Sequence, residues 1–142
     1  AAAALALLAD VAGLVLALDC GGLCAGVAYR LPAGRERDEL RVVWDREMAV
    51  DSYRASWVRA QTADGHVNAI TFVINRAADR YVGRLPEDVV VDRLANAEGY
   101  LGTSAEYLEN TVAHMRECGI TDRYMFRLQR LVARERANGQ QS

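Results

Sequence analysis

The chain contains no lysine, because all 17 of its basic residues are arginine. This exclusive use of arginine indicates a coding bias, typical of a GC-rich genome, more than a requirement of the protein's mechanism. The formal net charge is −2 at pH 7, so the sequence lacks the excess of positive charge that non-specific binding to nucleic acid requires. Since 51% of the 142 residues are hydrophobic, the chain can bury a core, and we expect one domain over residues 1–142.

Cysteine is scarce, with only Cys20, Cys24 and Cys118. An odd number without a dense framework is typical of a reducing compartment, so we expect a cytoplasmic protein without disulfides. Cys20 and Cys24 could form half of a metal site, but no second Cys/His pair with ligand spacing follows. His66 and His114 stand alone in the sequence. We therefore expect no bound metal.

The N-terminal stretch lacks the features of a leader or a membrane span. Residues 1–18 are almost all Ala, Leu and Val, without the basic residues that open a signal peptide. Asp10 and Gly13 interrupt the apolar run, so we expect no membrane span. The chain opens with four alanines and no initiator methionine. We expect that the true beginning of the protein is missing from these residues.

The patterns in the first half of the chain mostly predict strands. A turn signal, Ala63-Asp64-Gly65, separates two β-prone runs and favours a hairpin. The predicted strands are Leu14–Leu18, Cys24–Leu31, Tyr53–Thr62 and His66–Asn75.

Helical patterns dominate the second half, which makes the fold class α+β. One helix is expected earlier, over Glu36–Glu47. The later helices are predicted from Pro86 to about Ala97, from an N-cap at Ser104 through Cys118 before Gly119, and from Arg123 to about Arg136. Thr121 or Asp122 can cap the last helix, and the tail Asn138–Ser142 should fray.

Common catalytic motifs are absent. Gly21-Gly22 lacks the GxGxxG spacing of a phosphate-binding loop, and no GxSxG element occurs. Trp44 and Trp57 are interpreted as core residues, and His114 as a packed, hydrogen-bonded residue.

Glu47 is the most informative polar residue, because it continues an apolar stripe. Leu40, Val43 and Trp44 fall at i, i+3 and i+4 of the predicted helix, and Glu47 falls at i+7. The carboxylate is either solvated at a frayed helix end or held in a cleft. In a cleft, desolvation raises the pKa of a carboxylate and suits it to general-base chemistry. Tyr107, in the first turn of a later helix, is a candidate hydroxyl donor.

Five segments, in order, resemble the ChaC-like γ-glutamylcyclotransferases. G-V-A-Y-R-L-P-A-G (Gly26–Gly34) is followed by W-D-R-E-M (Trp44–Met48) and Y-R-A-S-W-V (Tyr53–Val58). Y-V-G-R-L-P (Tyr81–Pro86) resembles the family's Y-x-G-x-L-P. E-Y-L-E-N-T-V-A-H-M-R-E-C-G-I (Glu106–Ile120) resembles its E-Y-L-x-N-T-V-A-H-L-R-E-x-G-I. The resemblance covers nearly the whole chain.

The resemblance implies a small mixed β-barrel flanked by helices, with a helical C-terminal part. It implies a cytoplasmic enzyme that cyclises the γ-glutamyl group of glutathione, releasing 5-oxoproline and Cys-Gly, without a cofactor. Glu47 matches the catalytic acid/base of the family, and Tyr107 and Tyr53 match residues that bind substrate. The expected partner is therefore a small molecule, neither nucleic acid nor membrane, and the oligomeric state stays open.

The chain departs from the family pattern at two places. The family opens with Y-G-S-L, a loop whose backbone N–H groups hold the γ-glutamyl moiety, and no such segment occurs in the 142 residues. The family's S-G-x-N before E-Y-L is replaced by Leu101, Gly102, Thr103 and Ser104. Two functions therefore stay open: a γ-glutamylcyclotransferase, or a non-catalytic binding or regulatory module of the cation-transport-regulator type on the same scaffold.

Overall fold

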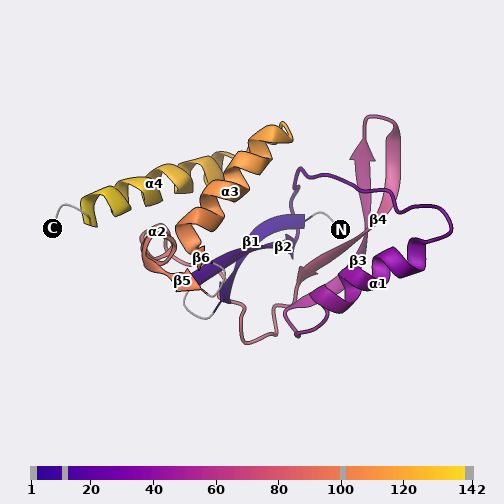
Figure 1. The fold of residues 1–142 in the computed structure, drawn as a ribbon, viewed down its shortest axis with the longest axis horizontal. Coiled ribbons are helices and arrows are strands. Elements are labelled where there is room, and N and C mark those ends of the chain that lie inside the picture. The colour runs from indigo at the N-terminus through magenta and orange to yellow at the C-terminus, as the bar shows by residue number, and fades with distance from the viewer. Residues whose placement is uncertain (1–2, 11–12, 100–101, 140–142) are drawn as a thin grey trace. The chain divides into compact units, whose positions relative to one another are not determined.

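The computed structural model describes residues 3–10, 13–99 and 102–139, which divide into two compact units. The first unit comprises residues 3–6 and 17–81, and the second comprises 7–10, 13–16, 82–99 and 102–139. The elements are β1 (Ala3–Asp10), β2 (Gly13–Cys20), α1 (Glu36–Glu47), β3 (Tyr53–Thr62), β4 (Gly65–Ile74), α2 (Glu87–Asn96), β5 (Glu98–Gly99), β6 (Gly102–Thr103), α3 (Ser104–Glu117) and α4 (Arg123–Gly139) (Figure 1). The expected α+β class is confirmed.

Four strands form one sheet in the order β1-β2-β4-β3. β2 runs parallel to β4, with Leu18 opposite Val73, and β3 and β4 form an antiparallel hairpin. The predicted hairpin is confirmed: Thr62 lies opposite Gly65, whose φ of 114° suits glycine. Over the described residues the sheet is open, and no barrel closes. β1 was missed, because its Ala-rich sequence carries little β-propensity.

Helix α1 has the bounds that the sequence predicts. Its least exposed residues are Glu39, Leu40, Val43 and Glu47, so the predicted stripe is confirmed, although none of them is fully buried. Trp44 is 40% exposed and meets Phe72 of β4 edge-on, with ring centroids 6.0 Å apart. Trp44 therefore packs one edge-on contact against the sheet while staying partly exposed, and its prediction as a core residue is wrong.

Two further predictions in the first unit are wrong. Trp57 is 69% exposed, because it lies on the same exposed face of β3 as Arg59 and Gln61. Residues 24–31 form no strand, and Leu23 and Tyr29 are 95% and 81% exposed. The alternating sequence pattern is compatible with a strand, but a strand also needs a neighbour for its backbone hydrogen bonds. Among the described strands, none has its sheet ladder extended by residues 24–31.

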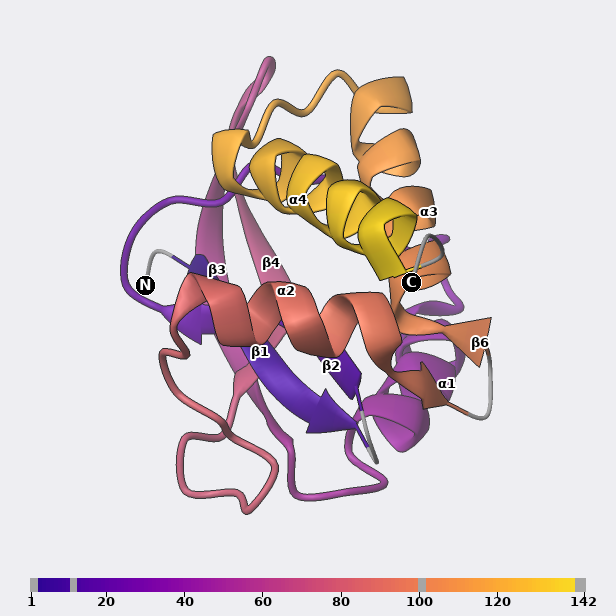
Figure 2. The same ribbon diagram turned by 90° about the vertical axis from the view of Figure 1, so that its left-hand side faces the viewer.

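The second unit contains most of the buried apolar side chains. Helices α2, α3 and α4 pack against one another (Figure 2). Each helix is apolar along one face, so the residues that it buries recur at helical spacing. Leu14 of β2 is buried with them. The buried side chains of this unit are Leu14, Val90, Leu94, Ala97, Ala105, Leu108, Val112, Met125, Leu128 and Val132.

The helix ends in this unit follow standard capping. Thr103, not the predicted Ser104, is the N-cap of α3, because its hydroxyl accepts from the Glu106 N–H while Glu106 accepts from the Thr103 N–H. The Thr103 N–H and the Thr103 hydroxyl both donate to the Glu106 carboxylate, and these two donors hold the pKa of Glu106 below its ordinary value. Asp122 caps α4 by accepting from the Met125 N–H at 2.9 Å, as one of the two predicted alternatives.

Two remaining expectations concern the chain ends. Helix α4 continues through Asn138 to Gly139, so the prediction that the tail frays from Asn138 is wrong there. The rest of the predicted tail, residues 140–142, lies outside the described residues. None of the helices in the described part is both long and apolar enough to cross a membrane.

Candidate active site

Glu47 is the last residue of α1, in the first unit. Its side chain is 23% exposed, and Oε1 accepts from Arg46 Nη2 at 2.7 Å and from Nε at 2.8 Å. Arg46 itself is 74% exposed, so this ion pair is screened by water and is easily exchanged for another partner. The carboxylate is partly shielded and paired, and so it differs from a fully solvated helix end.

The turn between Glu47 and β3 is held from the end of β4. Ser52 is buried, and its carbonyl accepts from the Asn75 N–H at 2.8 Å. The Asn75 side chain, also buried, donates to the Asp51 carbonyl at 3.0 Å and accepts from the Ala77 N–H at 3.2 Å. Asn75 therefore fixes the chain just after Glu47. Sequence reasoning missed this role and placed Asn75 in the strand.

Tyr53, the third predicted site residue, begins β3. It is partly buried and lies opposite Ile74 in the β3–β4 register. Glu47 and Tyr53 thus belong to the same unit and flank the turn that Asn75 holds. Tyr107 belongs to the second unit.

Tyr107 lies in the first turn of α3 and is 39% exposed. Its hydroxyl accepts from the Leu16 N–H of β2 at 3.4 Å, and its carbonyl accepts from the Thr111 hydroxyl at 2.7 Å. β2 passes close to this turn, because a Cβ at Gly13 would collide with Ser104 Oγ. The Tyr107 hydroxyl is thus directed at a strand backbone by a long hydrogen bond that a substrate group could replace.

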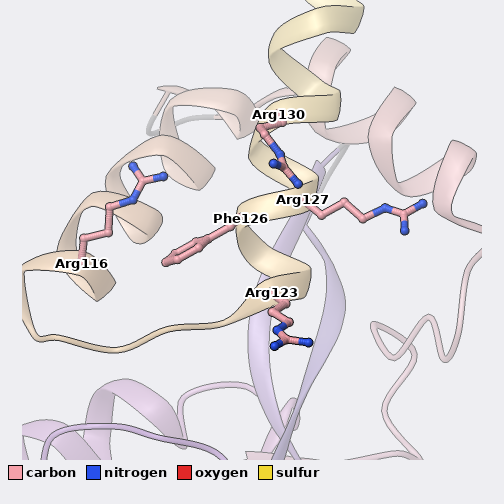
Figure 3. Close-up of a pocket in the computed structure, with 5 residues that line it drawn as sticks. All are labelled: Arg116, Arg123, Phe126, Arg127 and Arg130. Carbon is pink, nitrogen blue, oxygen red and sulfur yellow. The ribbon is translucent and has the colours of Figure 1, made fainter.

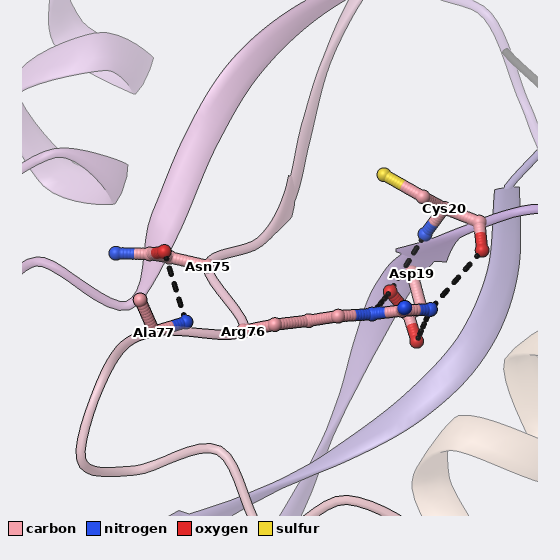
Figure 4. A network of polar contacts seen from close by, with 5 residues as sticks. All are labelled: Asp19, Cys20, Asn75, Arg76 and Ala77. Atoms are coloured by element: carbon pink, nitrogen blue, oxygen red, sulfur yellow. Dashed lines mark hydrogen bonds and ion pairs between the residues drawn. The ribbon is translucent and has the colours of Figure 1, made fainter.

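A polar cluster that the sequence did not predict joins the ends of β2 and β4. Arg76 donates from Nε and Nη2 to the two carboxylate oxygens of Asp19, both at 2.9 Å, and from Nη2 to the Cys20 carbonyl at 3.4 Å (Figure 4). The Arg76 guanidinium holds the pKa of Asp19 below its ordinary value, against the opposing effect of burial. This bidentate ion pair holds the ends of β2 and β4 together where their parallel pairing stops.

Arg76→Gln is expected to lower the melting temperature at pH 6, because it removes the ion pair of the largely shielded Asp19 carboxylate and leaves it the Cys20 N–H as a donor. The pKa of Asp19 is depressed in the folded state, so its contribution to stability is complete above the unfolded-state pKa of about 3.9 and is lost as the pH falls further. The melting-temperature difference from the parent protein should therefore shrink below about pH 4. Thermal unfolding from pH 2.5 to 7 measures it.

Arg59→Gln serves as the matched control, because Arg59 is an exposed arginine on β3 in the same unit. It should leave the melting temperature nearly unchanged at every pH. A difference between Arg76→Gln and the parent that stays constant through pH 3 would contradict the assignment to Asp19.

The histidines and cysteines do not form a metal site. His114 is exposed, with Nδ1 3.3 Å from Glu117 and Nε2 3.8 Å from the Cys118 sulfur, so its prediction as a packed residue is wrong. His114 lies on the exposed side of α3, because the helix buries Ala105, Leu108 and Val112 on its other side. Within the described ranges, no group of three or more His, Cys, Asp or Glu residues could hold a metal ion.

Comparison with known proteins assigns the family. Residues 8–135 match the family described as ChaC-like protein. The chain is 37% identical over 111 residues to a glutathione-specific gamma-glutamylcyclotransferase of Escherichia coli (strain K12), covering 78% of this chain and 48% of that protein. It is 26% identical over 104 residues to glutathione-specific gamma-glutamylcyclotransferase 1 of Mus musculus, covering 71% and 47%.

The chain thus spans about half the length of the curated relatives that it matches. The matched range includes the three predicted site residues, Glu47, Tyr53 and Tyr107. The chain belongs to the ChaC-like protein family.

Proposed function

We propose that this chain carries the general acid/base of a γ-glutamylcyclotransferase that acts on glutathione. The observation that supports this most directly is the 37% identity to the Escherichia coli enzyme of that name. The position of Glu47 agrees with it, since a partly shielded carboxylate ends α1 within the W-D-R-E-M segment. We assign Glu47 the catalytic role, and Tyr107 and Tyr53 contacts with the substrate.

The reaction needs one base and no cofactor. The α-amine of the γ-glutamyl group is mostly an ammonium at pH 7, and the Glu47 carboxylate takes its proton. The freed amine nitrogen attacks the γ-carbonyl carbon, and the bond from that carbon to the cysteinyl nitrogen breaks. Glu47 gives this proton to the leaving nitrogen, then takes the second proton that the ring nitrogen must lose and passes it to the released amine. The products are therefore 5-oxoproline and Cys-Gly with its amine protonated. Because the attack is intramolecular, correct orientation supplies much of the acceleration.

The surroundings of Glu47 suit this proton transfer. Arg46 is an exposed partner, so the ammonium of the substrate can replace it at Oε1 without breaking a buried ion pair. The turn held by Asn75 fixes the backbone that follows Glu47, which limits the positions open to the carboxylate. A base held in this way needs little reorganisation when the substrate binds.

The developing negative charge on the γ-carbonyl oxygen requires fixed donors. We propose that a Y-G-S-L-type loop supplies them through consecutive backbone N–H groups, as the family pattern implies. We also propose that further strands complete a barrel around the open sheet. Two features support this: β3 is an edge strand carrying an exposed Trp57, and the segment around Val27 and Tyr29 leaves apolar side chains uncovered.

Product analysis tests the proposed reaction. A protein that joins this chain to a Y-G-S-L-bearing segment of a family member should convert glutathione to 5-oxoproline and Cys-Gly in equal amounts, measured by mass spectrometry. Glutathione acetylated on its α-amine is the matched control and should give no product, because its nucleophile is blocked. Release of glutamate in place of 5-oxoproline would show hydrolysis and would contradict the proposal.

A further inference from the structure

An arginine-lined cavity lies in the second unit, on residues that the proposed cyclisation does not use. It has a volume of about 470 Å³ and is lined by Arg116, Arg123, Phe126, Arg127 and Arg130 (Figure 3). Small-molecule sites commonly measure about 300–1,000 Å³. The size therefore suits a compact ligand.

The spacing of the lining residues on α4 explains how they gather. Arg123, Arg127 and Arg130 are separated by four and three positions, so they follow one face of the helix, and Phe126 lies beside them. Arg116 comes from the last turn of α3 and places its guanidinium carbon 4.9 Å from the Phe126 ring centroid. The cavity thus combines an aromatic surface with guanidinium groups from two helices.

Among the residues that the structure describes, one of these four arginines is paired with a carboxylate. Arg127 donates to Glu87 of α2 at 2.7 Å, and Figure 3 shows it extending away from Phe126. Arg116 donates to the neutral Gln129 side chain at 3.1 Å. Arg123 and Arg130 form no ion pair with any residue in the described part of the chain. Arg116, Arg123 and Arg130 are therefore uncompensated by carboxylates, and Figure 3 shows the Arg123 side chain extending away from Phe126. A bound anion would relieve the repulsion among these charges.

We propose that this cavity binds a nucleotide, with its phosphates on Arg123, Arg130 and Arg116 and its base against Phe126. Guanidinium groups bind phosphate oxygens through pairs of parallel hydrogen bonds. They therefore favour phosphate over an anion that presents a single charged atom. The three uncompensated charges match the charge of a di- or triphosphate. The half-buried Phe126 ring, over which the Arg116 guanidinium lies, gives a flat surface on which a base can stack once Arg116 turns to the phosphates. This inference does not depend on the proposed cyclisation.

Calorimetric titration of the chain with ATP at physiological salt tests the proposal. Binding should saturate at one ATP per chain. Arg123→Gln and Arg130→Gln should each weaken it about tenfold or more, because each removes charge-assisted hydrogen bonds. Arg134→Gln is the matched control, an exposed arginine on α4 outside the cavity lining, and should leave the affinity unchanged. Circular dichroism establishes that each variant folds.

Separate probes distinguish the two halves of the ligand. Phe126→Leu should weaken the binding of ATP but not that of pyrophosphate. Adenosine alone should bind the parent protein more weakly than ATP or pyrophosphate does. The proposal is overturned if ATP does not saturate, or if Arg134→Gln weakens binding as much as Arg123→Gln. It is also overturned if oligonucleotides bind with an affinity that grows with their length, because that result indicates an extended nucleic-acid surface.

Discussion

Glu47→Gln, made in the chain joined to a Y-G-S-L-bearing segment, is expected to lower the rate of 5-oxoproline release from glutathione by about 10²–10⁴, the usual effect of losing a general base. Glutamine keeps the shape of the side chain but cannot accept the ammonium proton. The fold should survive, because Glu47 is only partly shielded and its ion pair with Arg46 is exposed. Steady-state rates of product formation, with circular dichroism of the same samples, measure both expectations.

Asp45→Asn is the control for this experiment. Asp45 lies on the same helix, is 67% exposed, and approaches Arg41 only to 3.6 Å. A surface carboxylate in such a contact contributes little to stability, so this change should be nearly silent in both measurements. If a folded Glu47→Gln protein retains full activity, the assignment of Glu47 as the base is wrong.

The second large effect concerns the Y-G-S-L-type loop. Residues 1–142 alone should turn glutathione over poorly, and the same residues joined to a Y-G-S-L-bearing segment should do so at an ordinary enzymatic rate. The γ-glutamyl group carries an α-carboxylate, and the reaction develops a second negative charge on the γ-carbonyl oxygen. One tyrosine hydroxyl such as that of Tyr107 cannot satisfy both, whereas a loop of backbone N–H groups can. Rates of 5-oxoproline release from the two proteins, at equal concentration, give the comparison.

A third protein controls for simple stabilisation by added residues. It carries the same segment with Y-G-S-L deleted, and it should fold as well as the active form but remain slow. Ordinary turnover by the 142 residues alone would disprove this explanation of substrate binding. A failure of all three proteins to release 5-oxoproline would favour the non-catalytic binding or regulatory module.

Local patterns predicted those parts of the fold that local interactions determine. The bounds of α1 follow from a stripe that includes Leu40 and Val43, and the β3–β4 hairpin follows from its Asp-Gly turn. The strand expected over 24–31 failed because pairing depends on a neighbour that the pattern of one segment does not specify. The same limit explains why the short β5–β6 pair was missed.

The contacts around the candidate site were harder to foresee, since they join residues far apart in the sequence. Glu47 could be identified because a carboxylate stands out on an apolar stripe. The Asp19–Arg76 pair and the hydrogen bond from Leu16 to Tyr107 link separate elements, and no spacing rule predicts them. Asn75 resembles any polar residue at the end of a strand until the turn that it supports is seen.

Asn75 fixes the turn after Glu47, and this determines how α1 can tilt. This helix is about 18 Å long, it buries no residue completely, and its chain is held most firmly just beyond its last residue. A tilt of the helix therefore pivots near Glu47, so the displacement is large at Glu36 and small at the carboxylate. Thermal motion and surface substitutions at the far end of α1 can then be absorbed with little disturbance of the proton-transferring group.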